Sequence, residues 1–190
     1  MKIVFILLFF LTANFAKPFV YNDSIVESLD PDTVKNDGDE FKIYKDRLKA
    51  LDENTPMDLS YNEKVQPFIE SYLGVNKKLI SKMQGLKELY FPLFEQNLDK
   101  YHLPLELKYL AIVESALNPK AKSRSGATGL WQFMYLTGKE YSLDVTSYMD
   151  ERQDPYKATE AACIYFVKLY EMFGDWNLVL AAYNGGPGYL

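Results

Sequence analysis

Apolar residues recur at helical spacing through most of the chain after residue 40. One helix face is indicated by an i, i+3, i+4, i+7, i+8 series, which consists of Val65, Phe68, Ile69, Tyr72 and Leu73. Ser60 and Glu63 have the spacing of a capping box at the start of that helix. Pro67 lies inside the series, so we expect it to kink the helix or to shift its start.

The same periodicity predicts further helices downstream. A second helix carries Leu79, Met83, Leu86 and Tyr90, and we expect it to stop before Pro92. Pro92 and Pro104 both resemble first-turn prolines of further helices. The last two expected helices are 158–173, closed by Gly174, and 177–183, closed by Gly185. No window alternates with the period of a strand, so the predicted fold class is mainly α.

The amino terminus has the pattern of a secretory signal peptide. Lys2 precedes an apolar run over residues 3–11, and Ala16 offers a small residue for cleavage. The run is shorter than the roughly 20 residues of a membrane span. We therefore expect a signal peptide over 1–16, an acidic and disordered linker over 17–40, a helical lead-in over 41–101 and a catalytic domain over 102–190.

Composition and charge exclude several classes of function. The 190 residues carry 21 Lys and Arg against 26 Asp and Glu, a net charge of −5, which argues against a nucleic-acid partner. One Cys and one His exclude a disulfide framework and nearly all His/Cys metal sites. The chain also lacks the glycine-rich phosphate-binding and dinucleotide-binding motifs. We expect neither a metal nor an organic cofactor.

The helix expected over 105–117, stopped by Asn118 and Pro119, carries the most informative residue. Glu114 falls on the same helix face as Leu107 and Leu117. A carboxylate among leucines is costly unless it is paired, hydrogen-bonded or protonated. Burial raises the pKa of such a group, and a raised pKa suits a general acid. A glutamate at the rim of the face, reaching water or an arginine, is the alternative.

Two other segments carry polar side chains beside turns. Gly126 and Gly129 predict a tight turn, after which Trp131 and Gln132 open a short helix. The Gln132 amide offers both a donor and an acceptor to sugar hydroxyl and acetamido groups. Trp131 in the core and a weak likeness to the GXXG loop of KH domains are alternatives. Near the carboxyl end, Tyr183 and Asn184 stand where a helix ends, and a plain helix cap with a buried tyrosine is the alternative.

Three short motifs occur in a fixed order: Glu114-Ser115, Gly129-Leu130-Trp131-Gln132 and Ala182-Tyr183-Asn184. Together they resemble the signature motifs of the lytic transglycosylase (SLT, goose-lysozyme-like) family. Upstream, Tyr61-Asn62-x-x-Val65 and Phe91-Pro92-x-x-Glu95 are similar to the lead-in of the membrane-bound D type of this family. Many relatives carry Met where this chain has Trp131.

The resemblance implies a lysozyme-like α fold whose cleft binds glycan strands of peptidoglycan. It implies cleavage between N-acetylmuramic acid and N-acetylglucosamine, with Glu114 acting first as general acid and then as base, and a 1,6-anhydromuramoyl product. Ser115, Gln132, Tyr183 and Asn184 would position the glutamate or the sugar, and Trp131 would line the sugar cleft. A hydrolytic goose-type lysozyme, with Asp144, Asp150 or Asp154 holding a water, and a non-catalytic wall-binding protein are the alternatives.

The resemblance also concerns the ends of the chain and its location. The family's domain continues past the third motif with another helix, and D-type relatives often add LysM repeats. We therefore expect the catalytic domain to be incomplete at its carboxyl end and LysM repeats to be missing. The signal peptide implies export to the periplasm or cell envelope, and a membrane association stays open.

Overall fold

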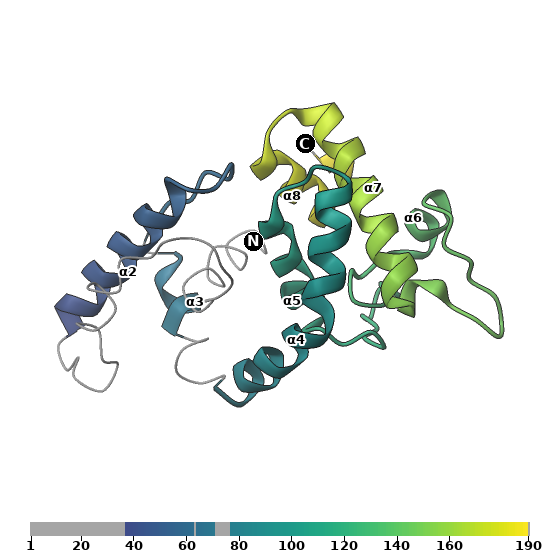
Figure 1. The fold of residues 1–190 in the computed structure, drawn as a ribbon, viewed down its shortest axis with the longest axis horizontal. Coiled ribbons are helices and arrows are strands. Elements are labelled where there is room, and N and C mark those ends of the chain that lie inside the picture. The colour runs from purple at the N-terminus through teal and green to yellow at the C-terminus, as the bar shows by residue number, and fades with distance from the viewer. Residues whose placement is uncertain (1–36, 63, 71–76, 190) are drawn as a thin grey trace.

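The structure is a computed structural model that describes residues 37–62, 64–70 and 77–189 (Figure 1). The expected signal peptide over 1–16 lies outside these residues. So do Glu63 of the expected capping box and the helix positions Tyr72 and Leu73. The first helix, α2 (Asp37–Asp52), begins inside the stretch that we expected as linker, so 37–40 are helical.

Helices dominate the described part of the chain, as predicted, and no named strand occurs in it. The elements after α2 are α3 (Gln66–Glu70), α4 (Lys77–Lys100), η3 (Leu105–Tyr109), α5 (Leu110–Ser115), α6 (Tyr135–Glu140), η4 (Glu151–Gln153), α7 (Pro155–Phe173), α8 (Trp176–Gly185) and η5 (Pro187–Tyr189). Isolated antiparallel bridges pair Lys122 with Thr128, Thr128 with Phe133, and Val145 with Asp150. The region between α5 and α6 is therefore an irregular loop that is pinned back on itself.

The core forms where α4, α7 and α8 pack together around the loop that follows α5 (Figure 1). Phe94 of α4, Trp131 of the loop and Phe166 of α7 are fully buried. The Trp131 ring centroid lies 5.0 Å from that of Phe94 and 5.9 Å from that of Phe166. Such aromatic contacts add to the burial of apolar area and fix the loop between the two helices.

Two prolines behave differently from the prediction. Pro104 is the N-cap residue before η3 rather than a residue of its first turn. Pro92 lies inside α4, which continues to Lys100, so the expected stop before Pro92 is wrong. Pro92 is exposed, and a carbonyl that loses its helical partner on the solvent side can bond to water. Phe94 and Leu98 beyond it are fully buried, and their packing stabilises the second half of the helix. Pro67, by contrast, stands in the first turn of α3, where it is tolerated.

The last two helices agree closely with the sequence. Gly174 caps α7 in the left-handed conformation, with φ of 65°, as predicted. Helix α7 begins at Pro155, after Asp154, whose carboxylate accepts from the backbone N–H groups of Tyr156 and Lys157. Helix α8 includes Gly185, and its cap is Gly186 rather than Gly185. None of the helices in the described ranges has the length and apolar character that crossing a membrane requires.

Candidate active site

Glu114 lies in the last turn of α5, a helix of only six residues. The expected continuous helix over 105–117 is wrong at both ends, because 105–109 form a 3₁₀ helix and Ser115 is the last α-helical residue. Ala116 and Leu117 both adopt positive φ values, 52° and 59°. This rare pair of left-handed residues turns the chain sharply just after Glu114 and buries Leu117 completely.

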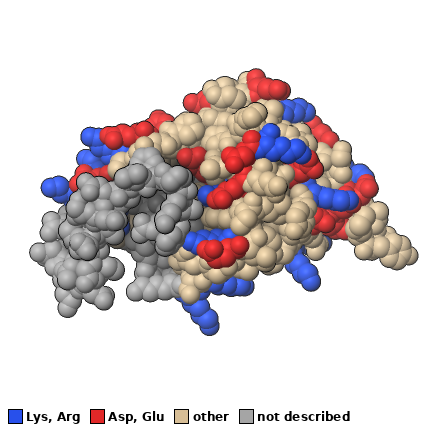
Figure 2. All heavy atoms as spheres, in the orientation of Figure 1, with Lys and Arg blue, Asp and Glu red and all other residues tan. Residues whose placement is uncertain are grey.

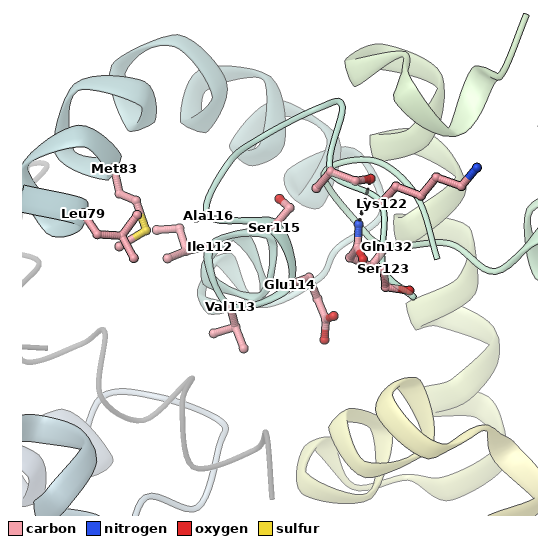
Figure 3. A pocket seen from close by; sticks show the side chains of 11 residues that line it. Leu79, Met83, Ile112, Val113, Glu114, Ser115, Ala116, Lys122, Ser123 and Gln132 are labelled. Carbon is pink, nitrogen blue, oxygen red and sulfur yellow. Dashed lines mark hydrogen bonds between the residues drawn. The ribbon is translucent and has the colours of Figure 1, made fainter. Parts of the chain in front are cut away.

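Glu114 borders a pocket of about 420 Å³ between α4, α5 and the loop after α5 (Figure 3). The pocket wall from α4 and α5 is largely apolar, and the wall from the loop is largely polar; the lining residues are Leu79, Met83, Ile112, Val113, Glu114, Ser115, Ala116, Ala121, Lys122, Ser123 and Gln132. Glu114 stands between the two walls and is half-buried. Of the lining residues, it alone carries a carboxylate.

Ser115 joins the end of α5 to the loop between α5 and α6, which carries Gly126 and Gly129 and is called the glycine loop. Its Oγ lies 2.9 Å from the carbonyl oxygen of Ala111 and 2.9 Å from that of Leu130, so its hydroxyl hydrogen is donated to these backbone acceptors. The bond to Leu130 spans 15 residues of sequence. Ser115 therefore holds the loop against the helix that carries Glu114.

Gln132 is not at the start of a helix, as the sequence suggested, but in a turn where its φ is 49°. Helix α6 begins only at Tyr135. The Gln132 Nε2 donates to the carbonyl oxygens of Gly129 at 2.9 Å and Ala121 at 3.3 Å. Because both amide hydrogens have backbone partners, the amide oxygen of this side chain is the group left for a ligand in the pocket.

Trp131 does not line the pocket, and its expected role as a sugar contact is corrected by the structure. The residue is fully buried, and its Nε1 donates to Thr159 Oγ1 at 3.0 Å. The indole is therefore a core residue with a satisfied polar atom, which is the alternative that the sequence left open.

Tyr183 reaches the same loop from α8. Its hydroxyl donates to the Trp131 carbonyl oxygen at 2.6 Å, and its ring stacks on Phe166 with centroids 5.0 Å apart. Burial, and then the negative charge of Glu114, raise the pKa of the Tyr183 hydroxyl well above its usual range. Tyr183 is thus a permanently protonated donor in the electrostatic neighbourhood of Glu114. Asn184 is exposed, and neither residue lines the pocket.

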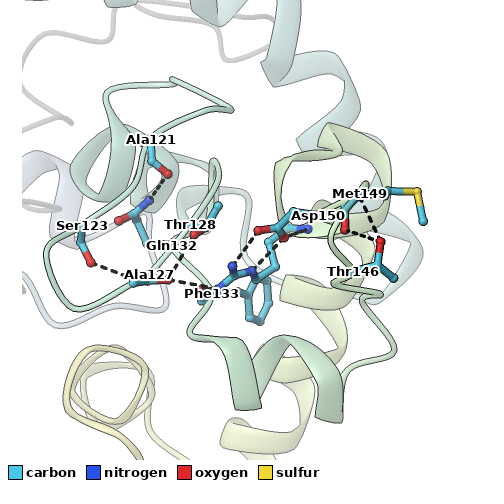
Figure 4. A network of polar contacts seen from close by, with 11 residues as sticks. Ala121, Ser123, Ala127, Thr128, Gln132, Phe133, Thr146, Met149 and Asp150 are labelled. Carbon is cyan, nitrogen blue, oxygen red and sulfur yellow. Dashed lines mark hydrogen bonds and ion pairs between the residues drawn. The ribbon is translucent and has the colours of Figure 1, made fainter.

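A hydrogen-bond network around Arg152, which the sequence did not reveal, stabilises the glycine loop (Figure 4). Arg152 is buried, and its Nη1 donates to the carbonyl oxygens of Gly126 and Phe133, each at 3.1 Å. Its Nε and Nη2 donate to the two carboxylate oxygens of Asp150, at 2.9 and 2.6 Å. Gly129 packs against the Arg152 backbone so closely that a Cβ there would lie 1.7 Å from the carbonyl oxygen.

The three aspartates considered as holders of a hydrolytic water have other partners. Asp150 is paired with Arg152, whose hydrogen bonds lower the pKa of the Asp150 carboxyl. Asp144 pairs with Lys139 at 3.3 Å. Asp154 caps α7. None of them lines the Glu114 pocket.

Two residues of the loop join the pocket although the sequence did not single them out as site residues. Lys122 and Ser123 line it beside Gln132. Both stand just before Gly126, in a stretch without regular periodicity. No sequence pattern therefore indicates which of its side chains face the pocket. No group of three or more His, Cys, Asp or Glu side chains suited to a metal ion occurs among the described residues.

A sequence comparison decides the family. The family model described as "Transglycosylase SLT domain" matches residues 92–190, which is more than half of the chain. The chain belongs to the SLT transglycosylase family. The matched region of this SLT chain begins within α4 and contains Glu114, Gln132 and Tyr183.

Several curated proteins resemble this SLT chain. The chain is 35% identical over 160 residues, 84% of its length, to "Membrane-bound lytic murein transglycosylase D" of Escherichia coli K12, and it spans only 34% of that protein. It is 33% identical over 127 residues, 61% of its length, to "Soluble lytic murein transglycosylase" of the same strain, of which it spans 20%. It is also 36% identical over 104 residues, 53% of its length, to "Peptidoglycan transglycosylase gp16" of Escherichia phage T7, of which it spans 8%.

Proposed function

We propose that this chain carries the catalytic centre of an exported lytic transglycosylase. It would cleave the glycan strand of peptidoglycan between N-acetylmuramic acid and N-acetylglucosamine without consuming water. The observation that carries the proposal is that Glu114 supplies the one carboxylate among the described residues that line the pocket, because hydrolytic glycosidases ordinarily use two. The three relatives described above, each named as a murein or peptidoglycan transglycosylase, support the same reaction.

One carboxyl group suffices when the substrate supplies the nucleophile. Protonated Glu114 gives its proton to the glycosidic oxygen as the bond from that oxygen to C1 of the muramoyl sugar breaks. The resulting Glu114 carboxylate then takes the proton from the C6 hydroxyl of the same sugar as O6 bonds to C1. Glu114 ends as it began, the product carries a 1,6-anhydro ring, and acid–base assistance of this kind is worth about 10²–10⁴ in rate.

The surrounding residues divide into a ligand contact and positioning residues. The Gln132 amide oxygen accepts from the N–H of an acetamido group, because its own N–H groups are bonded to the backbone. Ser115 and Tyr183 act through the loop backbone, to which their hydroxyls donate. Exposed Asn184 contacts glycan that extends beyond the pocket.

The test is an analysis of products formed from purified peptidoglycan. Mass spectrometry separates the two enzymatic outcomes, since anhydromuramoyl ends are lighter by one water than reducing ends. We expect anhydro ends from the native chain and none from Glu114→Gln, which keeps the shape of the side chain but cannot transfer a proton. Glu106→Gln is the matched control, because Glu106 is also half-buried but lies in η3 and does not line the pocket.

Three results would contradict the proposal. Reducing ends as the main product would identify a hydrolase. Turnover by Glu114→Gln above a few per cent of native turnover would exclude Glu114 as the acid, because losing an acid–base group costs about 10² or more. Binding of glycan without any cleavage by the native chain would identify a wall-binding protein instead.

A further inference from the structure

The part of the glycine loop that precedes Gly126 carries three positive side chains at alternate positions. These are Lys120, Lys122 and Arg124, and all three are exposed. Lys122 pairs through its backbone with Thr128 in an antiparallel bridge, which fixes its place in the loop. Of the three, Lys122 alone lines the Glu114 pocket.

Lys122 differs from several lysines of the described surface that form ion pairs. Its charge does reach one acid, since after Arg152 it contributes to lowering the pKa of the Asp150 carboxyl. Lys100, Lys139 and Lys168 form ion pairs with Glu160, Asp144 and Glu140 at 2.6, 3.3 and 2.7 Å. No ion pair or hydrogen bond joins the Lys122 ammonium to any side chain within the described ranges. On the face in Figure 2, basic and acidic residues are generally interspersed, whereas no acidic residue stands between Lys120, Lys122 and Arg124 along the chain.

The ammonium group of Lys122 does not serve Glu114 directly. Figure 3 shows the Lys122 side chain running away from Glu114, on the far side of Ser123 and Gln132. Lys122 therefore borders the pocket away from the Glu114 carboxylate, where a substituent of a bound sugar would lie nearer to it than the bond beside Glu114. Although the chain as a whole carries a net charge of −5, the positive charge of the Lys122 ammonium attracts an anion to the edge of the pocket.

We propose that Lys122 recognises a carboxylate on the C3 substituent of N-acetylmuramic acid, an inference that rests on the proposed function. The muramoyl sugar carries a lactyl group at C3, whose carboxyl is free in bare glycan and is joined to a peptide stem in the intact wall. The stem bears carboxylates of its own. N-acetylglucosamine has no carboxylate, so Lys122 distinguishes which sugar of the strand enters the Glu114 side of the pocket.

Lys120 and Arg124 strengthen this selection without contacting the pocket. Three positive charges within five residues raise the local positive potential, which draws a polyanionic strand toward the rim. An exposed ion pair contributes modestly, so we expect loss of the Lys122 charge to weaken binding of the carboxylate-bearing ligand about two- to fivefold. Added salt should reduce the difference, because screening acts within about 8 Å at physiological ionic strength.

The experiment measures binding in a Glu114→Gln background, so that turnover does not consume the ligand. Three soluble ligands are compared: a chitin oligosaccharide without carboxylates, bare glycan with lactyl carboxylates, and peptide-bearing glycan. We expect Lys122→Met to weaken binding of bare or peptide-bearing glycan but not of the chitin oligosaccharide. Whichever of the two responds identifies the carboxylate that Lys122 contacts.

Controls separate a specific contact from net charge. Lys122→Arg should retain binding, and Lys122→Glu should lose more than Lys122→Met. Lys49→Met removes one charge from an exposed site on α2 and should change nothing. Equal loss for all three ligands, or no loss for any, overturns the proposal for Lys122 while leaving the proposed function standing. Failure of the Glu114→Gln protein to bind any of the three ligands overturns both.

Discussion

Replacing Gly129 with alanine should damage the protein more than the loss of one glycine suggests. Gly129 has a φ of 87°, and its added Cβ would lie 1.7 Å from the backbone oxygen and 2.7 Å from the backbone carbon of Arg152. The obstacle is main chain, so no side-chain rotation relieves it. Either the glycine loop or the Arg152 segment must move, and with it the hydrogen bonds that join them.

The magnitude follows from two separable costs. A side chain at positive φ costs about 1–3 kcal/mol, and overpacking that shifts the backbone costs about 1–3 kcal/mol more. Gly126 provides the matched control, because its φ is 89° but nothing lies within 4 Å of the Cβ position. Gly126→Ala therefore bears the first cost alone, and the two variants should differ by about 1–3 kcal/mol of unfolding free energy.

Urea unfolding of the three proteins measures this difference directly, and activity on peptidoglycan is measured in parallel. We expect Gly129→Ala to have the lowest midpoint and to lose turnover, because Gln132 follows Gly129 in the same turn. In thermal melts, each kcal/mol corresponds to about 2–4 °C for a chain of this size. If Gly129→Ala were as stable as Gly126→Ala, the close packing against Arg152 would be refuted.

Three further predictions concern single side chains. Tyr183→Phe should lower the unfolding free energy by about 1–3 kcal/mol, because the Trp131 carbonyl oxygen loses its 2.6 Å partner while the ring packing stays; urea unfolding checks this, and an unchanged midpoint would contradict it. Cys163 should resist iodoacetamide at pH 8 until urea unfolds the chain, because burial raises the pKa of its thiol to about 12; rapid labelling of the folded protein, seen by mass spectrometry, would be the contrary result. Asp150→Asn should destabilise the protein near pH 7, since Arg152 keeps the folded-state pKa of Asp150 below the usual 3.8. This stabilisation is complete above pH 3.8 and is lost as the pH falls through the lower folded-state pKa, so the difference in melting temperature between variant and native protein should narrow in acid. A difference that does not depend on pH would refute the prediction.

The helices were predictable where local chemistry marks them. Gly174 marked the end of α7 correctly, because a glycine cap acts through neighbouring backbone atoms. The expected start at residue 158 was three residues late, since it did not use the capping signals of Asp154 and Pro155. Pro92 misled the prediction because its local effect is outweighed by the burial of Phe94 and Leu98, which are tertiary contacts. Residue spacing alone does not show that burial.

The sequence indicated part of the pocket lining but not its arrangement. Of the six expected site residues, three line the pocket, namely Glu114, Ser115 and Gln132, and the other three do not. The direction of Trp131 was not readable, because an irregular loop with a positive φ at Gln132 has no period that assigns side chains to a face. The Arg152 network was invisible for a related reason, since Asp150 and Arg152 pair across a turn rather than along a helix face.

The glycine loop also bears on the order in which the molecule assembles. The hydrogen bonds that hold it join residues that are distant along the chain. The separations are 15 positions for Ser115 to Leu130, 26 for Arg152 to Gly126, and 52 for Tyr183 to Trp131. Contacts of long sequence separation form late, because large loops must close first. The pocket wall should thus be completed after the helices have docked, and weakening it should hasten unfolding while leaving the folding rate nearly unchanged. The persistence of the active conformation would then be governed by the lifetime of a loop rather than by the strength of the helical core.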